Sequence, residues 1–169
     1  MWREILNVDP SCKEYFLNFE SLPGNGKTLI ACAGVSHLSN IYQIGKTGKG
    51  EYFNDRQNAR IHVHYLISTR SGAGKLTLDT GCQSIVPNTI MLIPAGTAFL
   101  YELDGEHWDM CWLLLHDCQE YQFIHQLKAG VWQNDNSSLI YQTMSLIRDF
   151  DHSYGRYQSD IQLRLIEVL

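Results

Sequence analysis

The chain has 169 residues, of which 44% are hydrophobic and 18% are charged, so it is long enough for one domain with a sizeable core but not for two full domains. Its net charge of -5 predicts no broad cationic face, which excludes neutralising the phosphates of DNA or RNA as the main role of this segment. Any contact with nucleic acid is expected to lie in another part of the protein.

Residues 1–27 are predicted to form an N-terminal arm. Charges are scattered through MWREILNVDPSCKEYFLNFE, so it is neither a signal peptide nor a membrane span, and a cytoplasmic location without membrane contact is expected.

The triplet Gly26-Lys27-Thr28 raises the question of a phosphate-binding loop. That loop needs a glycine where the chain has Ser21, and a helix where LIACAGVS lacks helical periodicity. We therefore interpret PGNGKT as a turn before a first strand at Thr28 to Cys32.

Residues 28–117 show short apolar runs separated by turn signals, which indicates β structure. In RIHVHYLIST the alternation places Ile61, Val63, Tyr65 and Ile67 on one side, and Gly72 and Gly74 after it are typical of a hairpin. The further runs are KLTL, CQSIV, TIMLI, TAFLYEL and WDMCWLLL, with turn signals at DTG, PN, PAG and DGEH between them. Strands at this spacing without intervening helices predict a closed barrel or sandwich of antiparallel strands.

After Asp117 the apolar residues recur at helical spacing in QEYQFIHQLK, NSSLIYQTMSLIRDF and YQSDIQLRLIEVL. Their apolar stripes are formed by Tyr121, Ile124 and Leu127, by Ile140, Met144 and Ile147, and by Ile161, Leu165 and Leu169. The fold class is therefore predicted as mainly β with C-terminal helices in residues 118–169. The last helix ends in IEVL with no capping glycine, polar tail or proline, so we expect the chain to stop short of a further region.

His62 and His64 are two residues apart on a predicted strand and therefore share a face. In metal-binding cupins such a pair binds zinc, iron or manganese when a carboxylate and a third histidine converge on it. Residues 67–69 contain no carboxylate, and Phe99 stands where the third histidine would be. No metal or other cofactor is therefore expected. The alternative is a small metal-dependent cupin enzyme that uses His62 and His64.

No sequence motif for catalysis is evident, since GxSxG is absent and the acidic residues fall mainly in predicted turns. The five cysteines are widely spaced and form no CxxC pair, which argues against disulfides and thiolate metal sites. These cysteines are Cys12, Cys32, Cys82, Cys111 and Cys118. We expect them to be reduced packing residues, and we expect the protein not to be an enzyme.

Five large side chains form a predicted cluster on two strands. Phe99 and Tyr101 alternate on one strand, and Trp108, Met110 and Trp112 alternate on the next. One interpretation is core packing, because aromatic rings contribute most to a small β core. The other is a small-molecule pocket, in which aromatic walls stack against a ligand and polar tips orient it.

The segment from Tyr65 to Asp117 resembles the amino-terminal effector-binding domain of AraC-type transcriptional regulators. The matching features are Gly72-x-Gly74, Pro87, LIPAG at Leu92 to Gly96, Tyr101, Trp108 and Trp112, in the family's order and spacing. The resemblance covers about residues 29–117, and the helices that follow fit the family's dimerisation region. It implies a cupin-like jelly-roll β-barrel in residues 28–117 that binds an effector, often a sugar, without metal or catalysis.

The resemblance also implies roles for individual residues. Tyr101 and Trp112 match sugar-contacting residues of the family, and an arginine before the Gly-x-Gly strand corresponds best to Arg56, with Arg60 and Lys46 as competitors. Phe99, Met110 and Trp108 would form the walls. Phe99 and Met110 stand at positions where the family has histidines, and PNT stands where the family has PGD. The pocket is therefore expected to be less polar than in sugar-sensing members of the family.

The helices are implied to pair two subunits through Ile140, Met144, Ile147, Ile161 and Leu165. In such regulators a helix-turn-helix region follows and reads the major groove of DNA. The expected partners are therefore a small effector, a second copy of the chain, and DNA only through a C-terminal domain absent from this chain.

Overall fold

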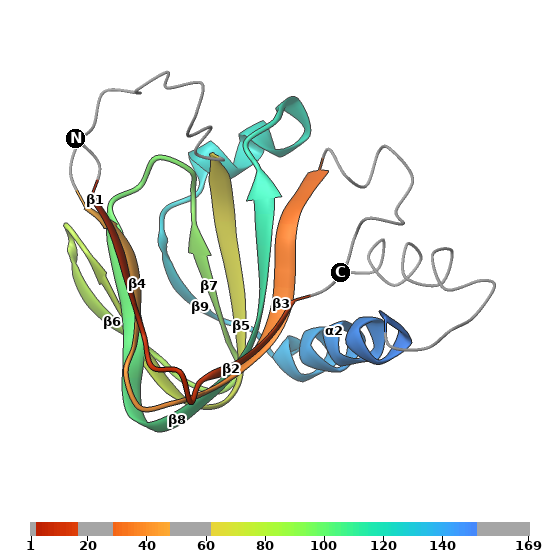
Figure 1. Ribbon diagram of the computed structural model, residues 1–169. Coiled ribbons are helices and arrows are strands. Elements are labelled where there is room, and N and C mark those ends of the chain that lie inside the picture. Colours follow the sequence, from red (N-terminus) through yellow and green to blue (C-terminus); the bar gives the residue numbers. More distant parts are fainter. Residues whose placement is uncertain (1–2, 17–28, 48–61, 152–169) are drawn as a thin grey trace.

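The computed structural model describes residues 3–16, 29–47 and 62–151, and their strands form one antiparallel sheet (Figure 1). The strands are β1 (Arg3–Val8), β2 (Lys13–Phe16), β3 (Ile30–Ser39), β4 (Tyr42–Thr47), β5 (Val63–Leu78), β6 (Gly81–Ile85), β7 (Thr89–Ile93), β8 (Phe99–His116) and β9 (Gly130–Gln133). A 3-10 helix, η1 (Gln119–Gln126), follows β8, and an α-helix, α2 (Ser137–Asp151), follows β9. The predicted series of antiparallel strands is confirmed.

The strands β5 and β8 are the longest, and they pair with each other along most of their length. Their register shifts between Thr69 and Ser71 and again between Gly72 and Gly74, where Gly72 has a φ of 75°. Such shifts bend a strand without ending it. The hairpin predicted at SGAG and the turn predicted at DGEH are therefore wrong, because both segments lie within continuous strands. Figure 1 shows β5 and β8 bending so that the sheet curls on itself.

The curled sheet separates two clusters of buried side chains, because successive residues of a strand point to opposite faces. On β8, Trp108, Met110 and Trp112 belong to the cluster on the inner face, which we call the inner core. Cys111 and Leu113 belong to the cluster on the outer face, the outer core, which α2 covers (Figure 1). The predicted alternation along this strand is confirmed.

The N-terminal residues predicted as an arm are part of the sheet wherever the structure describes them. β1 pairs with β4, and β2 pairs with β3, both antiparallel. Residues 17–28, including the predicted turn PGNGKT, lie outside the described residues. The boundaries proposed for the arm, the barrel and the helical segment stay a prediction.

The segment after β8 differs from the predicted first helix. Residues 119–126 form a 3-10 helix that buries only Ile124, while Leu127 lies beyond its end and is exposed. Gly130 and Val131 then continue as β9, which pairs with β7. Side chains three residues apart share a face in a 3-10 helix, but of the predicted stripe only Ile124 is buried.

The second predicted helix is confirmed as α2, but its buried face corrects one proposed dimer contact. Met144 is fully buried in the outer core, so its side chain packs within its own subunit and is not open to a second one. Ile140 packs partly against the same core. The side chain of Ile147, and all of Ile161 and Leu165, lie outside what the structure describes.

The five cysteines are free, as expected. Cys111 is buried and packs in the outer core, whereas Cys82 is exposed and is not a packing residue. Among the described helices, none combines the length and apolar character that crossing a membrane requires.

Candidate functional site

Five of the residues predicted to line the ligand pocket, the two ligand-contacting ones and the three wall residues, meet in the inner core. Their side chains are all buried, and Tyr42 and Tyr65 join them from β4 and β5. The predicted set is Phe99, Tyr101, Trp108, Met110 and Trp112. The structure therefore brings these residues together, and their contact with a ligand stays a prediction.

Tyr101 lies at the centre of the aromatic residues. Its ring stacks on Phe99 with centroids 5.8 Å apart and meets Trp108 edge-on at 6.1 Å. Burial above all raises the pKa of Tyr101 and of Tyr42 well beyond the usual range, so both phenols keep their protons. Each hydroxyl group can therefore donate as well as accept a hydrogen bond.

A chain of hydrogen bonds leads from Trp112 to a carboxylate on β2. The indole Nε1 of Trp112 donates to Ser36 Oγ at 2.9 Å, and Ser36 Oγ donates to Glu14 Oε1 at 3.3 Å. The Tyr42 hydroxyl donates to the same Glu14 oxygen at 2.9 Å. Glu14 and Ser36 are opposite each other in the β2–β3 register, which brings their side chains to one face. Glu14 therefore adds a carboxylate to the edge of the inner core.

The sequence analysis missed Glu14 because it assigned residues 1–27 to an arm. Glu14 and Phe16 are two residues apart and therefore lie on the same side of β2. This spacing was the signal in the sequence that could have indicated a strand here. Phe16 meets the Trp112 ring edge-on at 5.2 Å and remains 62% exposed. The inner core is thus bordered by solvent beside Phe16.

Of the three cations considered for the arginine position, Lys46 is the one that the structure describes. Its Nζ lies 5.5 Å from the centroid of the Tyr65 ring, a cation–π contact. Lys46 alternates with Tyr42 and Ile44 along β4, so it shares their inward face. Arg56 and Arg60 lie outside the described residues.

His64 does not face the inner core, in contrast to its neighbours in β5. Val63, Tyr65 and Ile67 are inner-core residues, so His64 points to the other face of the sheet. There it lies beside Asp117 and His125. A metal centre of the cupin type inside the sheet, built on His62 and His64, therefore gains no support from this geometry.

A groove of about 500 Å³ lies apart from the inner core, next to η1 and β9. Its apolar lining is Leu66, Ile90, Leu92, Leu127 and Trp132, and its polar lining is Gln126, Lys128, Gln133 and Asn134. None of the predicted site residues lines it, so it is a different surface from the predicted pocket.

No protein-family model and no curated protein matches this chain. Among solved structures, a protein named as glyoxylate-induced from Pseudomonas aeruginosa has 17% identity and a TM-score of 0.51, over 76% of this chain and 44% of that chain. At this identity the likeness shows a shared fold alone.

Two further solved structures are weaker matches. A cupin superfamily protein from Desulfitobacterium hafniense has 14% identity and a TM-score of 0.42, over 67% of this chain and 84% of that chain. The cupin domain of an XRE-family transcriptional regulator from Enterobacter cloacae has 10% identity and a TM-score of 0.43, over 64% of this chain and 99% of that chain. The resemblance to AraC-type regulators stays a prediction.

Proposed function

We propose that this chain is the effector-sensing and dimerisation domain of an AraC-type transcription regulator, and that it binds a small molecule, a sugar first of all, at the inner core. DNA would be contacted by a C-terminal domain outside residues 1–169. The effector would shift the population between two arrangements of that regulator.

The observation that carries this proposal is the set of polar groups at the edge of an aromatic interior. Glu14, Tyr42 and Ser36 form a hydrogen-bonded group beside the Trp112 indole. An aromatic ring can stack on the apolar face of a sugar ring, and a carboxylate and a hydroxyl beside it can bind the hydroxyl groups of the sugar. This combination suits a polyhydroxylated ligand. Lys46 adds a cation at the inward face of β4. Catalysis is not part of the proposal.

The direct test is a panel of sugars added to the purified chain, with thermal unfolding and tryptophan fluorescence as readouts. A bound sugar raises the melting temperature, because it binds the folded state and not the unfolded chain. Trp108 and Trp112 lie in the inner core, so the same sugar is expected to change the tryptophan emission of the wild type. The same change is expected in Trp132→Phe, which lacks the indole in the groove next to η1 and β9.

Glu14→Gln is the diagnostic variant, since it removes the charge while keeping the shape of the side chain. We expect it to weaken sugar binding about tenfold or more, which corresponds to about 1.4 kcal/mol, whereas the exposed matched control Glu106→Gln leaves binding unchanged. If no sugar or other small metabolite stabilises the chain, or if Glu14→Gln binds like the wild type, the assignment of this site is wrong.

A further inference from the structure

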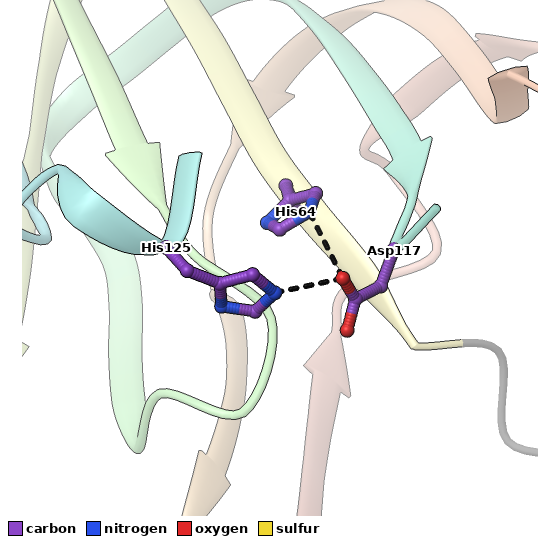
Figure 2. Close-up of side chains that lie close together, drawn as sticks. All are labelled: His64, Asp117 and His125. Carbon is purple, nitrogen blue, oxygen red and sulfur yellow. Dashed lines mark hydrogen bonds and ion pairs between the residues drawn. The ribbon is translucent and has the colours of Figure 1, made fainter. Parts of the chain in front are cut away.

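Three side chains that bind metals well meet on the outer face of the sheet, away from the inner core (Figure 2). His64 comes from β5, Asp117 follows the end of β8, and His125 belongs to η1. The backbone N–H of Asp117 donates to the carbonyl of His62 at 2.9 Å, which fixes Asp117 beside the start of β5. This cluster plays no part in the proposed effector site.

The spacing of the three ligand atoms suits a small cation. Asp117 Oδ1 lies 3.6 Å from His64 Nε2 and 2.7 Å from His125 Nε2, and one ligand atom from each residue lies within 4.8 Å of the other two. Zinc bonds of about 2.0–2.1 Å in a tetrahedron separate neighbouring ligand atoms by about 3.3–3.4 Å. The two separations measured from Asp117 Oδ1 lie on either side of that value.

Burial gives an independent reason to expect a ligand here. The side chain of His64 is fully buried, and among the buried side-chain nitrogen and oxygen atoms of the described residues its Nε2 is the one without a hydrogen-bond partner. Buried polar atoms without a partner are rare in native proteins because each costs free energy. Figure 2 shows this nitrogen directed toward the Asp117 carboxylate. Asp117 and His125 remain 26% and 42% exposed, so solvent reaches the cluster from their side.

We propose that His64 Nε2, His125 Nε2 and Asp117 Oδ1 bind one zinc ion, with a water molecule at the fourth position. Two imidazole nitrogens and one carboxylate oxygen favour zinc and its transition-metal neighbours over magnesium and calcium, which prefer oxygen ligands. Three protein ligands with an exposed side leave one position for water.

Zinc binding requires a change in the protonation of the His64 ring. The backbone N–H of Ala95 donates to His64 Nδ1 at 3.0 Å, so in the metal-free chain the ring proton is on Nε2. Zinc takes the lone pair of Nε2. That nitrogen therefore releases its proton to solvent while Nδ1 takes one up, and the ring stays neutral. Ala95 then loses its acceptor, so the turn at Pro94–Thr97 must adjust and the affinity is lower than that of a preformed site.

The change of the His64 tautomer on zinc binding can be measured, and zinc bound adventitiously at the surface would not cause it. In the ¹⁵N-histidine-labelled chain, zinc is expected to move the His64 ring from the Nε2–H to the Nδ1–H tautomer and to shift the amide signal of Ala95. Calorimetric titration of the EDTA-dialysed chain with zinc chloride is expected to give one site, and magnesium chloride is expected to give none.

Variants separate this site from other zinc-binding groups. His125→Asn and Asp117→Asn change partly exposed residues, so both should fold, and each is expected to weaken zinc binding about tenfold or more. His37→Asn, which alters a histidine paired with Asp109 elsewhere, and Cys118→Ser, which removes the adjacent thiol, are expected to bind zinc like the wild type. Unchanged binding by His125→Asn, or no tautomer change at His64 on addition of zinc, would overturn the proposal. The sugar panel has no bearing on it.

Discussion

Gly34 lies directly against the indole of Trp112. A Cβ atom at Gly34 would be 2.8 Å from Cε2 of Trp112 and 2.7 Å from the carbonyl oxygen of Tyr15. The absence of a side chain at Gly34 therefore lets the Trp112 ring approach β3 closely, where its Nε1 donates to Ser36 Oγ. The position of the indole beside Glu14 depends on this close approach.

Gly34→Ala is expected to lower the free energy of unfolding by about 1–3 kcal/mol, because the added methyl group must displace the indole or the backbone. Urea denaturation measures the change. In a Trp112→Leu background the shorter side chain leaves room, so the additional loss caused by Gly34→Ala should be smaller. An equal loss in both backgrounds would show that the Trp112 ring is not what the methyl group meets.

Tyr42→Phe removes the hydroxyl group that donates to Glu14 and leaves the ring in the inner core. We expect a loss of about 1–3 kcal/mol in the free energy of unfolding, since a buried polar network loses one member. The loss should shrink in a Glu14→Gln background, where the acceptor is changed as well. Tyr15→Phe, at an exposed tyrosine of the same strand as Glu14, serves as the control. Additive losses would refute the coupling of Tyr42 to Glu14.

The strand faces could be predicted from the sequence because strand alternation is a local property. Trp108, Met110 and Trp112 share a face for the same reason that His62 and His64 do, namely the two-residue period of the pleat. That period does not say which face is inside. His64 points outward, and its neighbours Asp117 and His125 follow it by more than fifty residues, so only the fold brings them together.

Glycine is ambiguous in the sequence, since it occurs in turns, in bulges and under large side chains. Gly72 and Gly74 were interpreted as a hairpin, yet they lie where β5 bends. A Cβ at Gly74 would be 2.7 Å from Cζ3 of Trp108, so this glycine makes room for an indole from β8. The long-range contact that explains it cannot be read from the residues next to it.

Asp109 gives a prediction about pH. Partial burial raises the pKa of this carboxyl, but hydrogen bonds from His37 and Ser71 outweigh it, and the net effect is a lowered pKa. A carboxyl group with a lowered folded-state pKa stabilises the fold above its unfolded-state value, near 3.8, and this contribution is lost as the pH falls through the folded-state value.

Asp109→Asn should therefore be less stable than the wild type at neutral pH, and the difference should shrink below about pH 3.8. Because His37 and Asp109 are both partly exposed, we expect a difference of at most about 1 kcal/mol. Urea denaturation at several pH values measures it, with Asp79→Asn, at an exposed turn, as the control. A difference that stays constant down to acid pH would contradict the role given to this carboxylate.

The outer surface of α2 is where the proposed dimer can be tested. Leu139 and Leu146 are seven residues apart, so they lie on one side of the helix, and they remain 58% and 48% exposed. Met144 is fully buried beneath the helix. If α2 pairs two subunits, these leucines are the large hydrophobic side chains of the described part of the helix that are exposed enough to make the contact. Leu139→Glu combined with Leu146→Glu should then shift the chain from dimer to monomer in sedimentation, because charges in an apolar interface are costly.

Met144→Ala is the matched control for that experiment. It opens a cavity in the outer core, so each subunit is expected to lose about 2–5 kcal/mol of stability while its outer surface stays the same. At temperatures where the variant is still folded, its association should equal that of the wild type. If the glutamate pair leaves the sedimentation unchanged, α2 is not the dimer contact. If the Met144 variant dissociates while folded, the contact depends on how α2 is seated on the sheet, since Met144 itself cannot reach a second subunit.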